Sequence, residues 1–165
     1  MEPELLLMSK IKKGDLEAFD SIVDKYKRGI YNHILLLSGS ASSAEELSQQ
    51  VFLEVFQQSQ TFQPKSKFST YIFSVAHRLC EEALPAQRRK SMPGEEEVKG
   101  DVTAKVRAEL FRLNRSYREV LILREIQRFN YEEIKEILSS PVERIRTILN
   151  RARRVFSKRI SRLLE

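Results

Sequence analysis

The sequence predicts an all-α protein with two small helical domains joined by a flexible linker. Apolar residues recur at steps of three and four along most of the 165 residues, which is the spacing of one buried helix face. Several of these stretches begin with residues that favour helix N-caps. Residues 85–101 contain two prolines, two glycines, a basic run and an acidic run, a composition typical of a linker. We therefore expect domains over 1–84 and 102–165.

The first domain is predicted to contain four helices. The first covers residues 4–12, and a turn and cap at Gly14–Asp15 precede a long second helix that runs to Leu37. Ser43 and Glu46 have the spacing of a capping box, in which each side chain bonds the other's backbone N–H, at the start of the third helix. Ser69 is typical of the N-cap of a fourth helix.

The second domain is predicted to contain helices over 102–113, 116–128, 131–138 and 141–164. Asn130 and Glu133 make a cap-like start for the third of these. Ser140 and Glu143 have the spacing of a capping box, and Pro141 then falls at the first helical position, where its missing N–H costs nothing. A short helix, a turn and an arginine-rich helix predict a helix-turn-helix of winged-helix-like type.

The last predicted helix carries an apolar stripe on one side and polar and basic side chains on the other. Arg, Asn, Thr and Glu can read base edges in the major groove, and Arg also binds phosphates. This side therefore predicts a surface for duplex DNA, and the alternative is a helix whose charges are merely solvated. The candidate residues are Pro141, Glu143, Arg144, Arg146, Thr147, Asn150, Arg151 and Arg154.

The net charge of +6 is unevenly distributed. Residues 105–165 hold 16 Lys and Arg against 8 Asp and Glu, a charge of +8, which leaves −2 for residues 1–104. A basic half favours a polyanion as partner, and nucleic acid is the first candidate. A membrane surface is the alternative, but paired, capped helices favour a folded module over a helix that lies on lipid.

Aromatic and basic side chains also gather around the fourth predicted helix. Rings can stack on the faces of bases while cations follow the backbone of single-stranded nucleic acid. The alternative is that the aromatics belong to the core, which we expect for Phe68 and Phe73. The candidate single-strand-binding residues are Phe62, Lys65, Lys67, Tyr71, His77, Arg78, Arg88 and Arg89.

The sequence predicts neither an enzyme nor a cofactor site. It contains no glycine-rich phosphate loop and no nucleophile motif. His77 and Cys80 lie one helical turn apart, but two ligands are too few for zinc, so we expect no metal. No apolar run approaches the ~20 residues of a membrane span, and a single cysteine excludes an internal disulfide. We expect a cytoplasmic protein without membrane insertion.

Several stretches together resemble the bacterial extracytoplasmic-function sigma factors of the sigma-70 family. The resemblance covers nearly the whole chain except the linker. Its motifs are "IKKGDLEAFDSIVDKYKRGIYN", "SAEELSQQVFLEVF", "TFQPKSKFSTYIFSVAHRL" and "SYREVLILREIQRFNYEEIKEILSSPVERIRTILNRARRVF". It implies a factor that binds core RNA polymerase and directs it to promoters, with region 2 melting the minus-ten element and region 4 reading the minus-thirty-five element. It also implies a protein that is monomeric when free and has an anti-sigma factor as partner.

By position, the resemblance assigns the expected third helix to the polymerase clamp. The implied contacts are Glu45, Glu46, Gln49, Gln50 and Glu54. The loop 62–67, with Tyr71 and Arg78, would hold a flipped minus-ten base. The region 4 helix would meet the minus-thirty-five duplex, where Glu143 either reads a cytosine amino group or serves only as a cap.

The sequence departs from the family pattern at four places. Gln50 stands where an acid is usual, Tyr71 where tryptophan is common and Arg78 where asparagine is common. Glu143–Arg144 follow Pro-Val where the family often has glycine and threonine. Two other functions stay open: a stand-alone helix-turn-helix regulator and a sigma mimic that titrates an anti-sigma factor. The first would leave the N-terminal domain without a role, and the missing acid at Gln50 is the reason to keep the second as an alternative.

Overall fold

The computed structural model describes residues 2–84 and 102–164, with side chains from residue 104 onward in the second range. All regular structure in these ranges is helical, as the sequence predicts, and they contain no strand that could form a wing. None of the described helices is both long and apolar enough to cross a membrane. The elements are α1 (Pro3–Lys12), α2 (Leu16–Ser38), α3 (Ala41–Gln58), α4 (Phe68–Ala83), α5 (Val102–Arg112), α6 (Arg115–Leu121), the π-helical turn η3 (Ile122–Ile126), α7 (Tyr131–Leu138) and α8 (Val142–Leu163).

Local capping sets the ends of several helices. The Asp15 carboxylate accepts hydrogen bonds from the backbone N–H groups of Glu17 and Ala18, at 3.0 and 3.2 Å, and so begins α2. Gly39, at φ 70°, ends α2 in the left-handed conformation that favours glycine. The predicted capping box at Asn130 and Glu133 is confirmed, with both bonds at 2.9 Å.

Two other predicted capping boxes are wrong. Helix α8 begins one residue late, because Pro141 is its N-cap with an extended backbone (φ −60°, ψ 146°) and no side-chain cap. The expected reciprocal bonds of Ser140 and Glu143 therefore do not form. Helix α3 begins earlier than predicted, because the Ser40 hydroxyl accepts from the Ser43 N–H at 3.2 Å. The fourth helix likewise has Lys67, and not Ser69, as its N-cap.

The single helix predicted over 116–128 is interrupted by a wide turn. Helix α6 continues into η3, a π-helical turn that accommodates one extra residue. The turn η3 ends at Ile126, and Arg128, with a φ of 66°, then directs the chain toward α7. The Arg124 guanidinium donates to the Phe129 carbonyl at 2.9 Å and closes this turn. Phe129 is thereby held in the core at 6% exposure.

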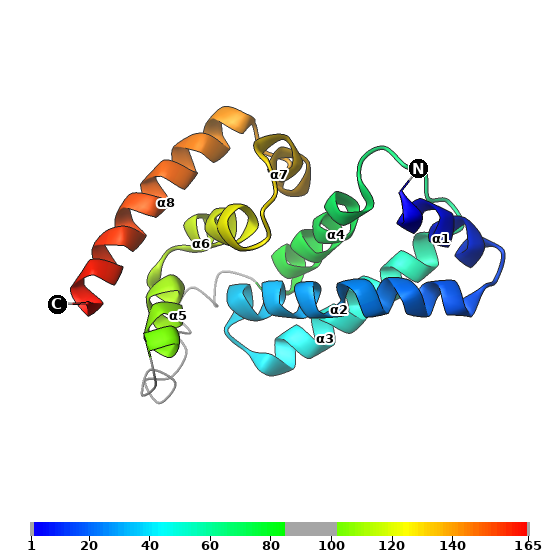
Figure 1. The fold of residues 1–165 in the computed structure, drawn as a ribbon, viewed down its shortest axis with the longest axis horizontal. Helices are drawn as coiled ribbons and strands as arrows, with labels where there is room; N and C mark the ends of the chain where they lie inside the picture. The colour runs from blue at the N-terminus through cyan, green and yellow to red at the C-terminus, as the bar shows by residue number, and fades with distance from the viewer. Residues whose placement is uncertain (1, 85–101, 165) are drawn as a thin grey trace.

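Helices α1, α3 and α4 pack against α2 in the N-terminal half (Figure 1). In the C-terminal half, α5, α6 and α7 pack against α8. The N-terminal core is built on the stripe of α2, including the fully buried Ile22, Ile30 and Ile34. In the C-terminal half, Ile134 of α7 packs with Ile145 and Leu149 of α8, and all three are fully buried. Each half thus contributes buried apolar residues at the positions that its helical periodicity predicts.

The two halves also pack against each other and share one continuous apolar core. Helix α4 lies against α7, and α2 contacts α5 and α6, while α8 lies on the outer side (Figure 1). The ring of Phe73 meets the ring of Phe129 edge-on with centroids 5.1 Å apart. Residues 85–101, where the linker was predicted, lie outside the described residues.

Buried polar side chains cross the junction between the halves. The Arg118 guanidinium donates to the carbonyl oxygens of Phe111, Leu113 and Leu37, at 3.2, 3.2 and 2.9 Å. Burial lowers the pKa of Arg118 to about 10, so it stays charged at neutral pH. Arg115 adds a bond to the carbonyl oxygen of Leu84 at 2.7 Å.

A buried carboxylate, Glu119 of α6, faces both histidines of the chain. Its Oε2 lies 2.8 Å from His77 Nδ1 and 4.0 Å from His33 Nε2. Burial lowers the pKa of His33 to about 4, against the attraction of Glu119, so this imidazole is neutral. Burial also disfavours protonated His77, but the hydrogen bond and charge of Glu119 outweigh it and raise the pKa of His77.

Candidate nucleic-acid interface

Helix α8 separates a buried face from an exposed polar face. Ile145, Leu149 and Ala152 are fully buried, which fixes the rotation of the helix on the domain. Pro141 and the seven other residues predicted to bind duplex DNA are all solvent-exposed. With α7 and the turn 139–141, α8 forms the predicted helix-turn-helix. The exposed face is therefore free to enter a major groove.

Most of the polar side chains on this face have no partner among the residues that the structure describes. Within residues 2–84 and 102–164, the side chains of Arg144, Arg151 and Arg154 make no hydrogen bond or ion pair. Arg146 instead lies over the Tyr131 ring at 5.3 Å, and the Thr147 hydroxyl donates to the Glu143 carbonyl at 3.0 Å. Because Glu143 takes no part in capping α8, its carboxylate is available to a ligand.

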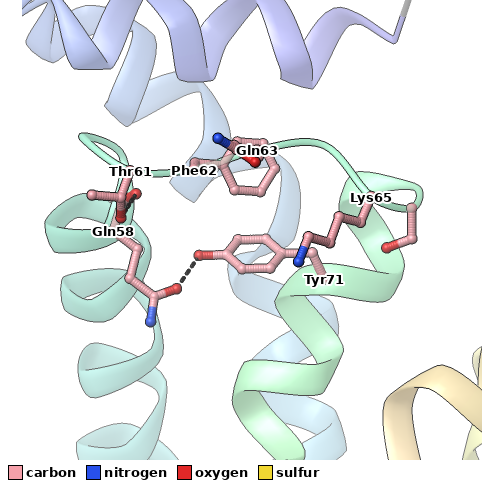
Figure 2. Close-up of a pocket in the computed structure, with 7 residues that line it drawn as sticks. Gln58, Thr61, Phe62, Gln63, Lys65 and Tyr71 are labelled. Carbon is pink, nitrogen blue, oxygen red and sulfur yellow. Dashed lines mark hydrogen bonds between the residues drawn. The ribbon is translucent and has the colours of Figure 1, made fainter.

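A pocket of about 380 Å³ opens between the end of α3, the loop that follows it and the start of α4. Figure 2 shows the Tyr71 ring reaching across it, with its hydroxyl donating to the Gln58 amide oxygen at 2.6 Å. Phe62 and Tyr71 lie with ring centroids 4.8 Å apart and planes tilted by 54°. The full lining is Gln58, Thr61, Phe62, Gln63, Lys65, Ser66 and Tyr71.

The pocket combines aromatic, amide and cationic groups. Its rings rest on Phe68, which is fully buried and lies 5.6 Å from Tyr71 and 6.3 Å from Phe62 between centroids. The expected core position of Phe68 and Phe73 is confirmed. Phe68 packs against the two aromatic rings of the pocket from the core side. Burial raises the pKa of Tyr71 to about 12, helped by Glu54, so its hydroxyl stays protonated and can donate. Such a pocket can hold a planar, partly polar ring.

Three other predicted single-strand-binding residues, Lys67, His77 and Arg78, do not line this pocket. Lys67 is exposed and lies 3.8 Å from Glu133 of α7. His77 is bound to Glu119 in the junction. Arg78 pairs with Glu54 and, at 3.2 Å, with Glu82. Arg88 and Arg89 lie outside the described residues. Of the described candidates, the structure thus brings Phe62, Lys65 and Tyr71 together and leaves Lys67, His77 and Arg78 apart.

Helix α3 exposes a second polar face. Glu45, Glu46, Gln49 and Gln50 are all solvent-exposed, and their helix is anchored by the buried Ala44, Leu47, Val51 and Val55. The fifth residue predicted there, Glu54, is half-buried by its ion pair with Arg78. This face points away from the core, on the side of α3 opposite its buried residues.

Two family models match the chain, in the order of its two halves. The model described as sigma-70 region 2 covers residues 22–90, and that described as sigma-70, region 4 covers residues 110–155. Together they cover more than half of the 165 residues.

The chain belongs to the sigma-70 family.

Curated relatives point to the extracytoplasmic-function group of this family, and solved structures share the fold. The ECF RNA polymerase sigma factor SigW of Bacillus subtilis is 25% identical over 93% of this chain and 94% of its own. The RNA polymerase sigma-H factor of Pseudomonas aeruginosa is 24% identical over 99% and 96%. The fold is similar to that of CnrH in complex with the cytosolic domain of CnrY, with a TM-score of 0.78 and 18% identity over 95% and 96% of the chains.

A second solved structure has the same fold. The sigma factor RpoE from Bartonella quintana, in complex with the anti-sigma factor NepR, gives a TM-score of 0.74 at 16% identity over 88% of this chain and 98% of that one. The predicted resemblance is therefore confirmed, and the chain is an extracytoplasmic-function sigma factor that directs transcription initiation at promoters. Sigma factors as a family are not enzymes.

Two exposed apolar residues of the sigma factor were missing from the sequence prediction. Leu53 and Phe56 are 55% and 38% exposed on α3, on the helix that carries the predicted clamp contacts. Phe56 meets Phe19 of α2 edge-on at 5.1 Å. Both fall outside the stripe through Leu47, Val51 and Val55, and that offset was a signal available in the sequence.

Proposed function

We propose that this sigma factor reads the minus-thirty-five duplex with α8. The observation that carries the proposal is the exposed face of α8, where arginine, asparagine, threonine and glutamate side chains stand on a helix fixed by its buried stripe. Arg144, Arg151 and Arg154 have no partner within the described residues, so binding DNA requires no ion pair to break first. Arg146, which lies over the Tyr131 ring, contacts a phosphate at the edge of this DNA-facing surface.

The pocket formed by Phe62, Lys65 and Tyr71 captures one unstacked base of the minus-ten element. Extruding a base costs a few kcal/mol, and stacking on an aromatic ring returns about 1–3 kcal/mol. Phe62 and Tyr71 supply the rings, Gln58 and Gln63 supply amide groups for a base edge, and Lys65 can meet a phosphate. A factor without a nucleotide cofactor can bias strand opening in this way.

The outer face of α3 binds the clamp of core RNA polymerase. Its polar contacts are Glu45, Glu46, Gln49 and Gln50, and Leu53 and Phe56 form an apolar centre beside them. An interface with an apolar centre and a polar rim is typical of protein partners. Gln50 removes one negative charge relative to the family pattern. The apolar surface of Leu53 and Phe56 can still be buried against the polymerase, and this contribution to binding does not depend on the lost charge.

An anti-sigma factor is the second protein partner, and the free chain is a cytoplasmic monomer. Two sigma factors of the same fold were solved with a partner, NepR in one case and the cytosolic domain of CnrY in the other.

Run-off transcription with core polymerase and a pool of genomic promoter fragments tests the whole proposal. We expect the wild-type factor to produce discrete transcripts whose upstream sequences share two elements. A transcript set that is unchanged by Arg151→Ala would remove α8 from promoter reading. Retention on immobilised core polymerase separates the polymerase contact from promoter reading: Leu53→Ser should reduce it and Arg151→Ala should not.

A further inference from the structure

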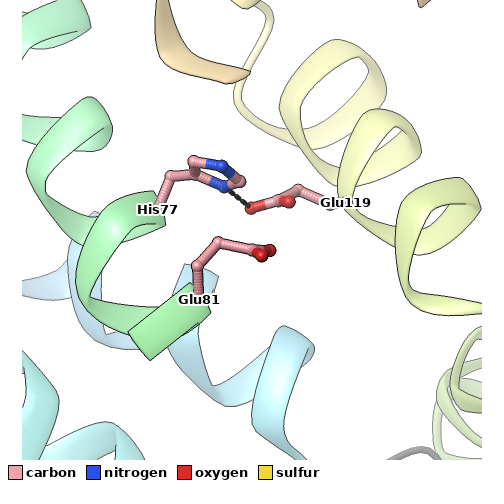
Figure 3. Close-up of side chains that lie close together, drawn as sticks. All are labelled: His77, Glu81 and Glu119. Carbon is pink, nitrogen blue, oxygen red and sulfur yellow. Dashed lines mark hydrogen bonds and ion pairs between the residues drawn. The ribbon is translucent and has the colours of Figure 1, made fainter. Parts of the chain in front are cut away.

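Three side chains converge where the two halves of the chain meet. His77 and Glu81 lie one turn apart on α4, and Glu119 reaches them from α6 (Figure 3). Their ligand atoms, one imidazole nitrogen and two carboxylate oxygens, all lie within 4.8 Å of one another. Figure 3 shows the His77 ring and both carboxylates turned toward the same point. None of the promoter-binding surfaces proposed above uses Glu81 or Glu119.

A second observation at the same place is the state of His33. This side chain is fully buried on α2, and neither ring nitrogen has a hydrogen-bond partner in the structure. Its Nε2 points toward Glu119 at 4.0 Å, and its ring stands edge-on to Phe73 at 5.3 Å. A fully buried imidazole without any partner is rare, because burial removes its water hydrogen bonds. The chain has two histidines, and both therefore face one carboxylate.

We propose that His77, Glu81 and Glu119 bind one divalent transition-metal ion of the Zn²⁺ class, and that His33, which lies outside this group of three but faces Glu119, moves in as the fourth ligand. Two imidazoles and two carboxylates are a ligand set that zinc accepts. Zn–N and Zn–O bonds of about 2.0–2.1 Å in a tetrahedron place ligand atoms roughly 3.3 Å apart. The separation of His77 and Glu119, 2.8 Å, is shorter than that value, and His33, 4.0 Å from Glu119, has to move closer to join the other three ligands.

The existing contacts of these ligands are compatible with an ion. A metal would take the place of the proton shared by His77 and Glu119. Arg115 Nη2 lies 3.1 Å from one oxygen of Glu81, and the second oxygen of that carboxylate remains for the ion. Two carboxylates also balance the charge of one divalent cation, and that balance lowers the cost of holding it in a half-buried site.

The ligands come from both halves of the sigma factor. His33 of α2 and His77 and Glu81 of α4 belong to the N-terminal half, whereas Glu119 of α6 belongs to the C-terminal half. An ion here would fasten α6 to α2 and α4. The sequence excluded a metal on the pair His77 and Cys80, whereas the structure brings two carboxylates to His77, one of them 42 residues away along the chain.

Zinc titration of the full chain, freed of metal with a chelator, tests the site. We expect one Zn²⁺ per chain by calorimetry, and a higher unfolding midpoint with Zn²⁺ than without it. Co²⁺ should give the visible absorption of a four-coordinate N/O site. No binding above that of scattered surface carboxylates, or several weak ions per chain, would overturn the proposal.

Variants locate the ion. Glu81→Gln should weaken Zn²⁺ binding at least about tenfold, and because Glu81 is exposed this variant keeps its fold. His77→Ala should abolish the Co²⁺ spectrum. Glu82→Gln is the matched control, because Glu82 is the next residue and pairs with Arg78 instead. Equal affinity in wild type, Glu81→Gln and His77→Ala would place any bound ion elsewhere.

Discussion

Arg118 donates a hydrogen bond to the carbonyl oxygen of Leu37, 2.9 Å away, although the two residues are 81 positions apart. Leu37 lies near the end of α2, and its carbonyl would otherwise be among the last, unpaired ones of that helix. One buried guanidinium thus completes a helix of the N-terminal half while it also binds two carbonyls of its own half.

Replacing Arg118 should therefore destabilise the whole protein. In Arg118→Ala three buried carbonyl oxygens lose a charged donor, and we expect a loss of about 1.5–3 kcal/mol in the free energy of unfolding. Urea denaturation followed by circular dichroism measures it. Arg107→Ala is the control, because Arg107 is exposed on α5. A similar, small loss in both variants would mean that the guanidinium contributes no more than a surface charge.

Arg151→Ala should weaken binding to the promoter duplex. Loss of a bidentate contact to guanine costs about 1–3 kcal/mol, whereas loss of a phosphate contact mainly reduces the salt dependence of binding. Anisotropy of a labelled minus-thirty-five duplex at several salt concentrations distinguishes the two. Arg153→Ala is the matched control, because Arg153 bonds Glu125 at 2.6 Å and is already paired. Wild-type affinity of Arg151→Ala at every salt concentration would take this residue out of the groove.

Tyr71→Ala should impair strand opening more than closed-complex formation. The alanine removes the ring on which a base would stack, while α8 still holds the upstream duplex. Permanganate reactivity of minus-ten thymines reports opening, and a mobility shift at low temperature reports the closed complex. Tyr71→Phe keeps the ring and loses only the bond to Gln58, so it should open nearly as well as wild type. Normal thymine reactivity in Tyr71→Ala would dismiss the pocket as a base site.

The ion pair of Glu4 and Lys25 should make stability depend on pH. Burial alone would raise the pKa of Glu4, but hydrogen bonds from Lys25 and Tyr26 and the charge of Lys25 outweigh it, so that pKa is lowered from 4.5. The pair therefore stabilises the fold above the unfolded-state pKa of about 4.3, and this stabilisation is lost as the pH falls through the folded-state pKa.

Lys25→Met tests this dependence. It should cost about 1 kcal/mol at pH 7, and the difference from wild type should shrink toward pH 3 as Glu4 becomes protonated. Lys27→Met is the control, because Lys27 pairs with the exposed Asp24 at 3.4 Å. A difference that stays constant from pH 7 to pH 3 would show that Lys25 acts through packing and not through charge.

The sequence predicts the helices because their apolar stripes are long and regular. The range predicted for α7 is the one observed, and most other ends are within one or two residues. The errors lie where two local signals compete. At Ser140 the serine favours a cap, but Pro141 has the extended backbone of an N-cap itself and leaves Ser140 outside the helix. At Ser43 an earlier serine, Ser40, takes the capping role.

For the candidate site, too, the sequence predicts what depends on neighbouring residues and misses what depends on contacts between distant ones. The exposed face of α8 follows from helical periodicity, and so the eight predicted residues lie together. The role of His77 could not be predicted, because its partner Glu119 is 42 positions away and only packing of α4 on α6 joins them. Helical periodicity likewise gives no sign that Arg78 pairs with Glu54, which lies 24 positions away.

The wide turn at Ile122–Ile126 gives this region of the chain one residue more than a regular helix of the same length would hold. Deleting a single residue there would let α6 continue as a regular α-helix of the same length, and the chain on either side would keep its place. We therefore expect the Phe129 ring to stay against Phe73 and the DNA-facing side of α8 to keep its direction. A relative one residue shorter at this turn can thus retain the same promoter selectivity.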